Sequence, residues 1–97
     1  MDNVLIIPAA HRPLVASMEL SLENMQYVVG GYIEVARSTD RFALLCNEEG
    51  RLIGLPVNGN VPDLCGDLLL CGIDGEDFCG LSQQDLTLAC ALLEVKL

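Results

Sequence analysis

Few residues of this chain are of the types that carry out chemistry. His11 is the single histidine, and one histidine after a strand is more often part of a turn than a general base. The five cysteines contain no Cys-x-x-Cys pair that would indicate zinc; they are Cys46, Cys65, Cys71, Cys79 and Cys90. We therefore expect no catalytic residue, no metal and no cofactor, and the odd number of thiols suits a reducing cytosol.

The carboxylates of Asp74, Glu76 and Asp77 lie close enough in sequence to suggest calcium binding. However, the glycine and the distal glutamate of an EF-hand loop are not in register with them. The chain also has no phosphate-cradling glycine loop and no nucleophile elbow. We therefore interpret these residues as a solvated acidic turn, and we predict that the protein is not an enzyme.

The charge balance narrows the classes of partner. Fourteen acidic and five basic residues give a formal net charge of −9, which opposes binding to the phosphates of nucleic acids. The same charge permits a basic protein partner, or it only keeps a small apolar domain in solution. We expect no direct contact with nucleic acid.

Length and hydropathy indicate one globular domain over residues 1–97. Ninety-seven residues, 52% of them hydrophobic, are enough for one core and too few for two domains. No run approaches the roughly 20 apolar residues that span a bilayer, and the first residues lack the basic leader of a signal peptide. We expect a cytoplasmic protein without a membrane partner.

Hydrophobic periodicity predicts the strands that must position the polar residues. A continuous apolar run over 4–7 and an alternating pattern from residue 14 to 20 indicate two strands that form a hairpin. Further strands are predicted at 32–37, 42–46 and 67–73. The residues Asn47-Glu48-Glu49-Gly50 are typical of a tight turn, after which residues 51–55 are expected to return as a partner strand.

Two helices are predicted from their first turns. Ser21 and Ser82 each follow a leucine and are placed to accept a backbone N–H as N-caps, and Gly30-Gly31 allows the first helix to end. At 100° per residue, the second helix has apolar groups on two opposite faces. One face is formed by Leu86, Ala89, Cys90, Leu93 and Leu97, and the other by Leu88, Ala91, Leu92 and Val95.

A domain of this size can cover one such helix face with its own sheet. We therefore expect the face of Leu88, Ala91, Leu92 and Val95 to contact another copy of the chain, which would make the protein a homo-oligomer. The alternative is that the long loop over residues 57–66 covers this face internally. Together, the elements predict an α+β fold in the order ββαβββα, with a mostly antiparallel sheet of about five strands and two helices packed to one side.

Three segments of the chain carry a family resemblance, namely VVGGYIEVAR, ALLCNEEGRLIGLPVN and GDLLLCG. Their pattern of GGYIE, then CNEEG and GLPxN, resembles an uncharacterised domain family of small proteins encoded by phages, conjugative elements and gut Firmicutes. The match covers nearly the whole chain. It implies no known activity, but it implies a mobile-element protein in the cytoplasm of a bacterial host, where small accessory proteins often antagonise host defence.

The family pattern draws attention to polar residues near the turns of the predicted sheet. As a hypothesis, these residues form a polar rim that binds a small ligand or a partner at one end of the sheet. The rim would consist of Tyr32, Glu34, Asn47, Glu48, Arg51 and Asn58. The alternative is structural, with Asn47 serving only the turn, Pro56 ending a strand and Asn58 capping its own loop.

Three functions are compatible with these observations. The first is a non-enzymatic accessory protein of a mobile element, whose acidic surface engages a basic host protein such as a defence factor. The second is an oligomeric small-molecule binder that sequesters a nucleotide-type signal at the rim. The third, with the least support, is an enzyme of unfamiliar type.

Overall fold

The computed structural model describes all 97 residues, which form a six-stranded sheet and two helices. The strands are β1 (Asp2–Ile7), β2 (Leu14–Met18), β3 (Ile33–Ser38), β4 (Phe42–Asn47), β5 (Leu68–Asp74) and β6 (Asp77–Cys79). The helices are α1 (Leu22–Val29) and α2 (Gln83–Leu93). The predicted α+β class is confirmed, and the predicted order ββαβββα holds for the helices and the five longer strands.

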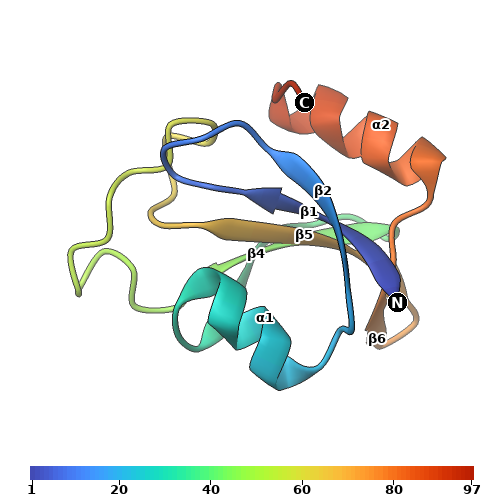
Figure 1. The fold of residues 1–97 in the computed structure, drawn as a ribbon, viewed down its shortest axis with the longest axis horizontal. Helices are drawn as coiled ribbons and strands as arrows, with labels where there is room; N and C mark the ends of the chain where they lie inside the picture. Colours follow the sequence, from blue (N-terminus) through green and yellow to red (C-terminus); the bar gives the residue numbers. More distant parts are fainter.

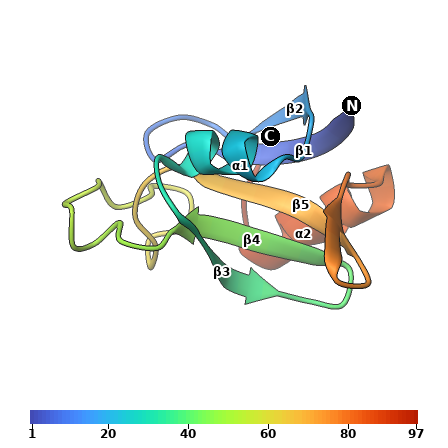
Figure 2. The ribbon, with the colours of Figure 1, turned by 90° about the horizontal axis from the view of Figure 1, so that it is seen from below.

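The strands pair in the order β2-β1-β5-β4-β3, with the short β6 also paired to β5, and Figure 2 shows β5 and β4 in the middle of the sheet. Every pairing is antiparallel, as predicted. All six residues of β4 are buried, and so are the first five of β5. These central strands carry most of the core, while β2 and β3 form the edges.

The two helices cover opposite faces of the sheet (Figure 1). Because side chains alternate along a strand, each central strand contributes to two separate cores. The core under α2 includes Leu5, Leu44, Leu68, Leu70, Leu86, Ala89 and Val95, and the core under α1 includes Val4, Met25, Val29, Ala43, Leu45 and Leu69. The prediction that both helices pack to one side is therefore wrong, since strands that are apolar on both faces need a cover on each.

Both predicted helix starts are confirmed. The Ser21 hydroxyl accepts the Asn24 N–H at 3.1 Å, and the Ser82 hydroxyl accepts the Asp85 N–H at 3.0 Å. Gly30 ends α1 in the left-handed conformation, with φ at 80°, and its N–H donates to the Gln26 carbonyl. These local contacts set the helix ends independently of the rest of the fold.

One prediction about the connections is wrong, and one short strand was not predicted. Residues 51–55 form no strand, because residues 49–55 close into a compact turn in which the Ile53 N–H donates to the Glu49 carbonyl at 3.0 Å. The acidic residues 74–77 do make a tight turn around Gly75, but the chain then returns as β6, and Asp74 pairs with Asp77. This short strand pairs with β5 on the same side as β1. It occupies the part of the β5 edge that β1 leaves unpaired, and that free edge exists only in the assembled sheet.

Candidate functional site

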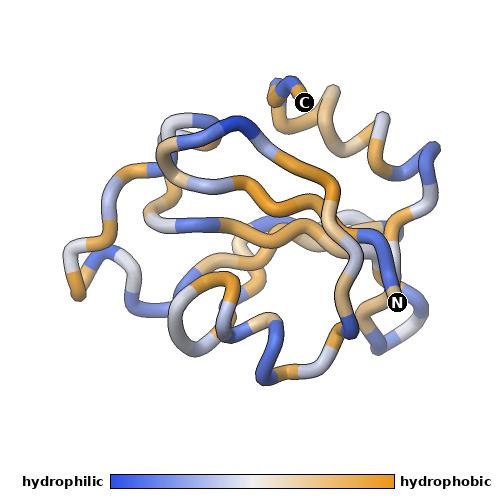
Figure 3. The backbone as a smooth tube through the Cα atoms, viewed as in Figure 1, coloured by the Kyte–Doolittle hydropathy of each residue, from blue (hydrophilic) through white to orange (hydrophobic).

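The twenty residues 48–67 that connect β4 to β5 form the longest connection in the fold. Figure 1 shows this loop projecting from one end of the sheet, and Figure 3 shows that its outermost turn is hydrophobic. Connections of this length without helix or strand are uncommon in small domains and often serve binding. The predicted rim also lies mostly at this end of the molecule.

Asn47 has a structural role at the base of this loop. It is 6% exposed, its Nδ2 donates to the Val29 carbonyl at 3.2 Å, and its Oδ1 accepts the Glu49 N–H at 2.8 Å. The first bond satisfies a carbonyl at the end of α1 that has no partner within the helix, and the second fixes the turn after β4. Asn47 therefore joins α1 to the loop, and it also lines both hollows at this end of the sheet.

Asn58 is fully buried. Its Nδ2 donates to the carbonyls of Ile7 and Gly66, both at 2.9 Å, and its Oδ1 accepts the N–H groups of Asn60 and Val61 at 2.8 and 3.0 Å. All four bonding positions of the amide are thus occupied. The prediction that Asn58 belongs to a binding rim is wrong, because this side chain holds the returning half of the loop against the end of β1.

The structure brings Asn47 and four further rim residues together at the loop end; these are Tyr32, Glu34, Glu48 and Arg51. Tyr32 is 67% exposed, and its carbonyl accepts the Glu48 N–H at 2.9 Å, which places the start of β3 beside the end of β4. Glu34, Glu48 and Arg51 line one hollow of about 150 Å³. Arg51 also donates through Nη2 to the Asp63 carbonyl at 2.7 Å, so it ties the two halves of the loop together.

Sequence reasoning missed two apolar residues at the tip of the loop. Leu52 is 86% exposed and Ile53 is 57% exposed, and Ile53 lines a second hollow, of about 300 Å³, together with Tyr32 and Glu49. The sequence did contain a signal for a turn at this place. Glycines at positions 50 and 54 flank these residues and Pro56 follows, a pattern that is more typical of a turn than of a strand. We define the loop-end surface as Tyr32, Glu34, Glu48, Glu49, Leu52 and Ile53.

The outer face of α2 is a second exposed apolar feature. Leu88 is 44% and Leu92 is 59% exposed, and Ala91 between them is also exposed, so the long loop does not cover this face. The predicted fourth member, Val95, is 7% exposed and belongs to the core. The reason is that Glu94 adopts a left-handed conformation, with φ at 56°, and ends the helix before Val95.

The titratable side chains offer little for catalysis. Burial raises the pKa of Cys71 to about 12, and it is also the main cause of the raised pKa values of Cys46, Cys79 and Cys90. These four thiols are therefore protonated at neutral pH and poorly nucleophilic. His11 is exposed in the bend between β1 and β2, and no group of three histidine, cysteine or acidic side chains is arranged to hold a metal ion.

Neither α1 nor α2 has the length and apolar character that crossing a lipid bilayer requires.

Comparison with known proteins gives one result. A family model described as a domain of unknown function, DUF3846, matches residues 1–94. No curated protein and no solved structure matches significantly.

Proposed function

The chain belongs to the DUF3846 family, a domain of unknown function, and we propose that it is a binding protein without enzymatic activity. It docks on a basic partner protein through the loop-end surface. The observation that carries this proposal is the pair Leu52 and Ile53, which are 86% and 57% exposed at the tip of a projecting loop. Moving exposed apolar groups of this kind from water into a partner's pocket lowers the free energy, so such groups mark interaction sites.

Hydrogen bonds connect the two halves of the loop, which supports the proposal. The Leu55 N–H donates to the Gly50 carbonyl at 2.9 Å, and the Gly66 N–H donates to the Pro56 carbonyl at 2.7 Å. Arg51 and Asn58 add the side-chain bonds described above. A surface that is already ordered loses less conformational entropy on binding, so these apolar anchors are well suited to recognition.

The charges around the anchors indicate the kind of partner. Glu34, Glu48 and Glu49 are exposed beside Leu52 and Ile53, in a chain whose formal net charge is −9. A complementary partner presents an apolar pocket with a basic border. In this proposal the protein is an accessory protein of a phage or other mobile element, acts in the cytoplasm of the bacterial host, and antagonises a defence protein there.

The test places a photo-crosslinking residue at position 52 in the full chain, identifies the captured host protein, and measures its affinity by titration calorimetry. The variant Leu52→Ser/Ile53→Ser should bind that protein at least tenfold more weakly while unfolding at the same urea concentration as the parent. Leu22→Ser is the matched control, because Leu22 is 57% exposed on α1. Equal affinity of the parent and the double variant would refute the proposal.

The electrostatic part has its own test. The affinity for the captured protein should fall as salt rises from 50 to 500 mM, because ions screen the attraction between acidic and basic surfaces. An affinity that does not change with salt would mean that the glutamates do not contribute.

The second candidate function is an oligomeric binder that sequesters a small nucleotide-like molecule at the rim. The hollow of about 300 Å³ beside Tyr32 supports it, since an aromatic ring and a nearby glutamine can hold a base. The surrounding glutamates weigh against a phosphate at the same place. Native mass spectrometry of gently purified protein distinguishes the candidates, because only a sequestering protein retains a nucleotide. An enzyme of unfamiliar type is the third and weakest candidate.

A further inference from the structure

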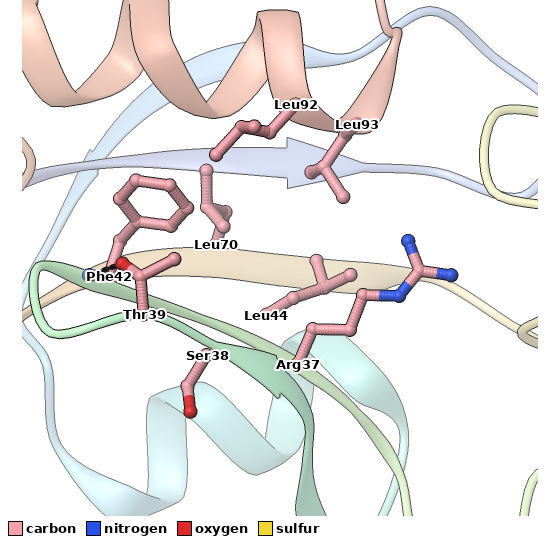
Figure 4. Close-up of a pocket in the computed structure, with 8 residues that line it drawn as sticks. All are labelled: Arg37, Ser38, Thr39, Phe42, Leu44, Leu70, Leu92 and Leu93. Atoms are coloured by element: carbon pink, nitrogen blue, oxygen red, sulfur yellow. Dashed lines mark hydrogen bonds between the residues drawn. The ribbon is translucent and has the colours of Figure 1, made fainter.

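A cleft of about 230 Å³ lies between α2 and strands β3 and β4, away from the loop-end surface. Figure 4 shows its apolar side chains, with Leu92 and Leu93 above and Phe42, Leu44 and Leu70 below. It exists because the buried row of α2 packs on the middle of the sheet and leaves the β3 side uncovered. The other three lining residues are polar, namely Arg37, Ser38 and Thr39.

A β-bulge directs a single cation to this cleft. Val35 pairs with Leu45, but Arg37 pairs with Leu44, so that one extra residue, Ala36, is inserted in β3. Without the extra residue Arg37 would face α1. With it, Arg37 lies on the same face as Leu44, which belongs to the core under α2. Bulges often redirect a side chain at a functional position, and in Figure 4 the Arg37 guanidinium lies beside Leu44 and Leu93.

The charge of this cleft is opposite to that of the chain. Arg37 is the only charged residue that lines it, whereas glutamates line both hollows at the loop end, one of them together with Arg51, and the net charge of the chain is −9. Asp63 forms an ion pair with Nη2 of Arg37, which occupies one of the five N–H donors of the guanidinium. The remaining donors can bind a second carboxylate.

We propose that this cleft binds an aliphatic monocarboxylate of medium length. Its carboxylate bonds to Arg37, and its alkyl chain lies against Phe42, Leu70 and Leu92. This ligand is the simplest chemical class that joins one anionic group to an apolar body, as the cleft requires. The assignment is independent of the loop-end surface and of the protein partner proposed above.

The test titrates the full chain with butanoate, hexanoate and octanoate, followed by protein NMR. Affinity should rise about fourfold for each methylene that enters the cleft, and octanoate should shift the methyl signals of Leu44, Leu92 and Leu93. Octanol should bind about 10- to 100-fold more weakly than octanoate, because it cannot form the charge-assisted bonds to Arg37.

Two variants of exposed residues test the role of Arg37. Arg37→Gln should lower the affinity for octanoate about 10- to 100-fold, to the affinity that the parent has for octanol. Asp63→Asn is the matched control, because it also breaks the ion pair but keeps the guanidinium, so octanoate should bind it at least as tightly as the parent. Both side chains are about half exposed, so neither variant should disturb the fold.

Several results would overturn the proposal. These are the absence of octanoate binding at millimolar concentration, an affinity that does not depend on chain length, and equal binding by Arg37→Gln and the parent. NMR shifts confined to Tyr32 and Ile53 would show that octanoate binds at the loop end, and this result would also reject the proposal. Binding of a short peptide with a C-terminal leucine, without binding of octanoate, would show that the cleft recognises a chain end instead.

Discussion

Asn58 contributes strongly to stability, because its one buried amide forms hydrogen bonds with backbone groups of three segments. Replacing it with alanine leaves the carbonyls of Ile7 and Gly66 and the N–H groups of Asn60 and Val61 without that partner. Each buried polar group left unpaired costs about 1–3 kcal/mol. We expect Asn58→Ala to lower the free energy of unfolding by at least about 3 kcal/mol, measured by urea denaturation.

Asn3→Ala is the control for this substitution. Asn3 is exposed, and its side chain makes no hydrogen bond in the structure, so the change should stay within about 0.5 kcal/mol. Similar losses for the two variants would contradict the buried role of Asn58.

The neighbouring pair Gly31 and Asn47 shows why a glycine follows the first helix. A Cβ on Gly31 would lie 2.8 Å from Nδ2 of Asn47, so Gly31→Ala should cost about 1–3 kcal/mol through overpacking. In the background of Asn47→Ala the obstructing amide is absent, and the same change should be almost neutral. A double-mutant cycle by urea denaturation measures this coupling, and strictly additive effects would show that the amide is not the obstacle.

At the scale of the element, the end of α2 is the strained point. Glu94 has φ at 56°, a conformation that costs a residue with a side chain about 1 kcal/mol or more relative to glycine. We expect Glu94→Gly to raise the free energy of unfolding by about 0.5–1 kcal/mol, measured by thermal and urea denaturation.

Glu94→Ala separates the backbone effect from the charge. It removes the same carboxylate from the C-terminal end of the helix but keeps a side chain in the left-handed conformation, so it should not reproduce the full gain. An equal gain in both variants would assign the effect to the helix dipole.

At the scale of the whole molecule, the exposed apolar groups on the outer face of α2 are the candidate contact between copies of the chain. The helix has 11 residues and is therefore about 16 Å long, which is short for an interface that needs about 800 Å² from each partner. We propose a reversible homo-oligomer through Leu88, Ala91 and Leu92, visible by light scattering at high micromolar concentration. Every copy carries a formal charge of −9, so the copies repel each other. Added salt screens this repulsion and should favour the oligomer.

The variant Leu88→Glu/Leu92→Glu should be monomeric at all concentrations. Gln84→Glu adds a negative charge to an exposed position of the same helix and should leave the assembly in place. A parent protein that stays monomeric at high micromolar concentration in high salt would end this proposal.

Much of the fold was predictable because its signals are local. Ser21, Ser82 and Gly30 act within one turn of their own helices, and the apolar runs of β4 and β5 are unbroken in the sequence. The position of Arg51–Leu55 was not predictable from alternation, because glycines on either side allow a turn that the hydrophobic pattern alone does not distinguish from a strand. For the same reason the exposed tip of Leu52 and Ile53 was missed.

The sequence by itself determined both helix starts, the end of α1, the class of fold, the acidic character and the scarcity of catalytic groups, since these depend on residue type and near neighbours. The tertiary structure decided which polar residues are free. Asn47 and Asn58 are buried and donate to carbonyls far away in the sequence. Val95 lies in the core. One inserted residue in β3 places Arg37 on the α2 side of the sheet. These outcomes depend on contacts between segments that are far apart in the chain. Such contacts contribute free energy only in the folded state, so residue types and near neighbours in the sequence do not reveal them.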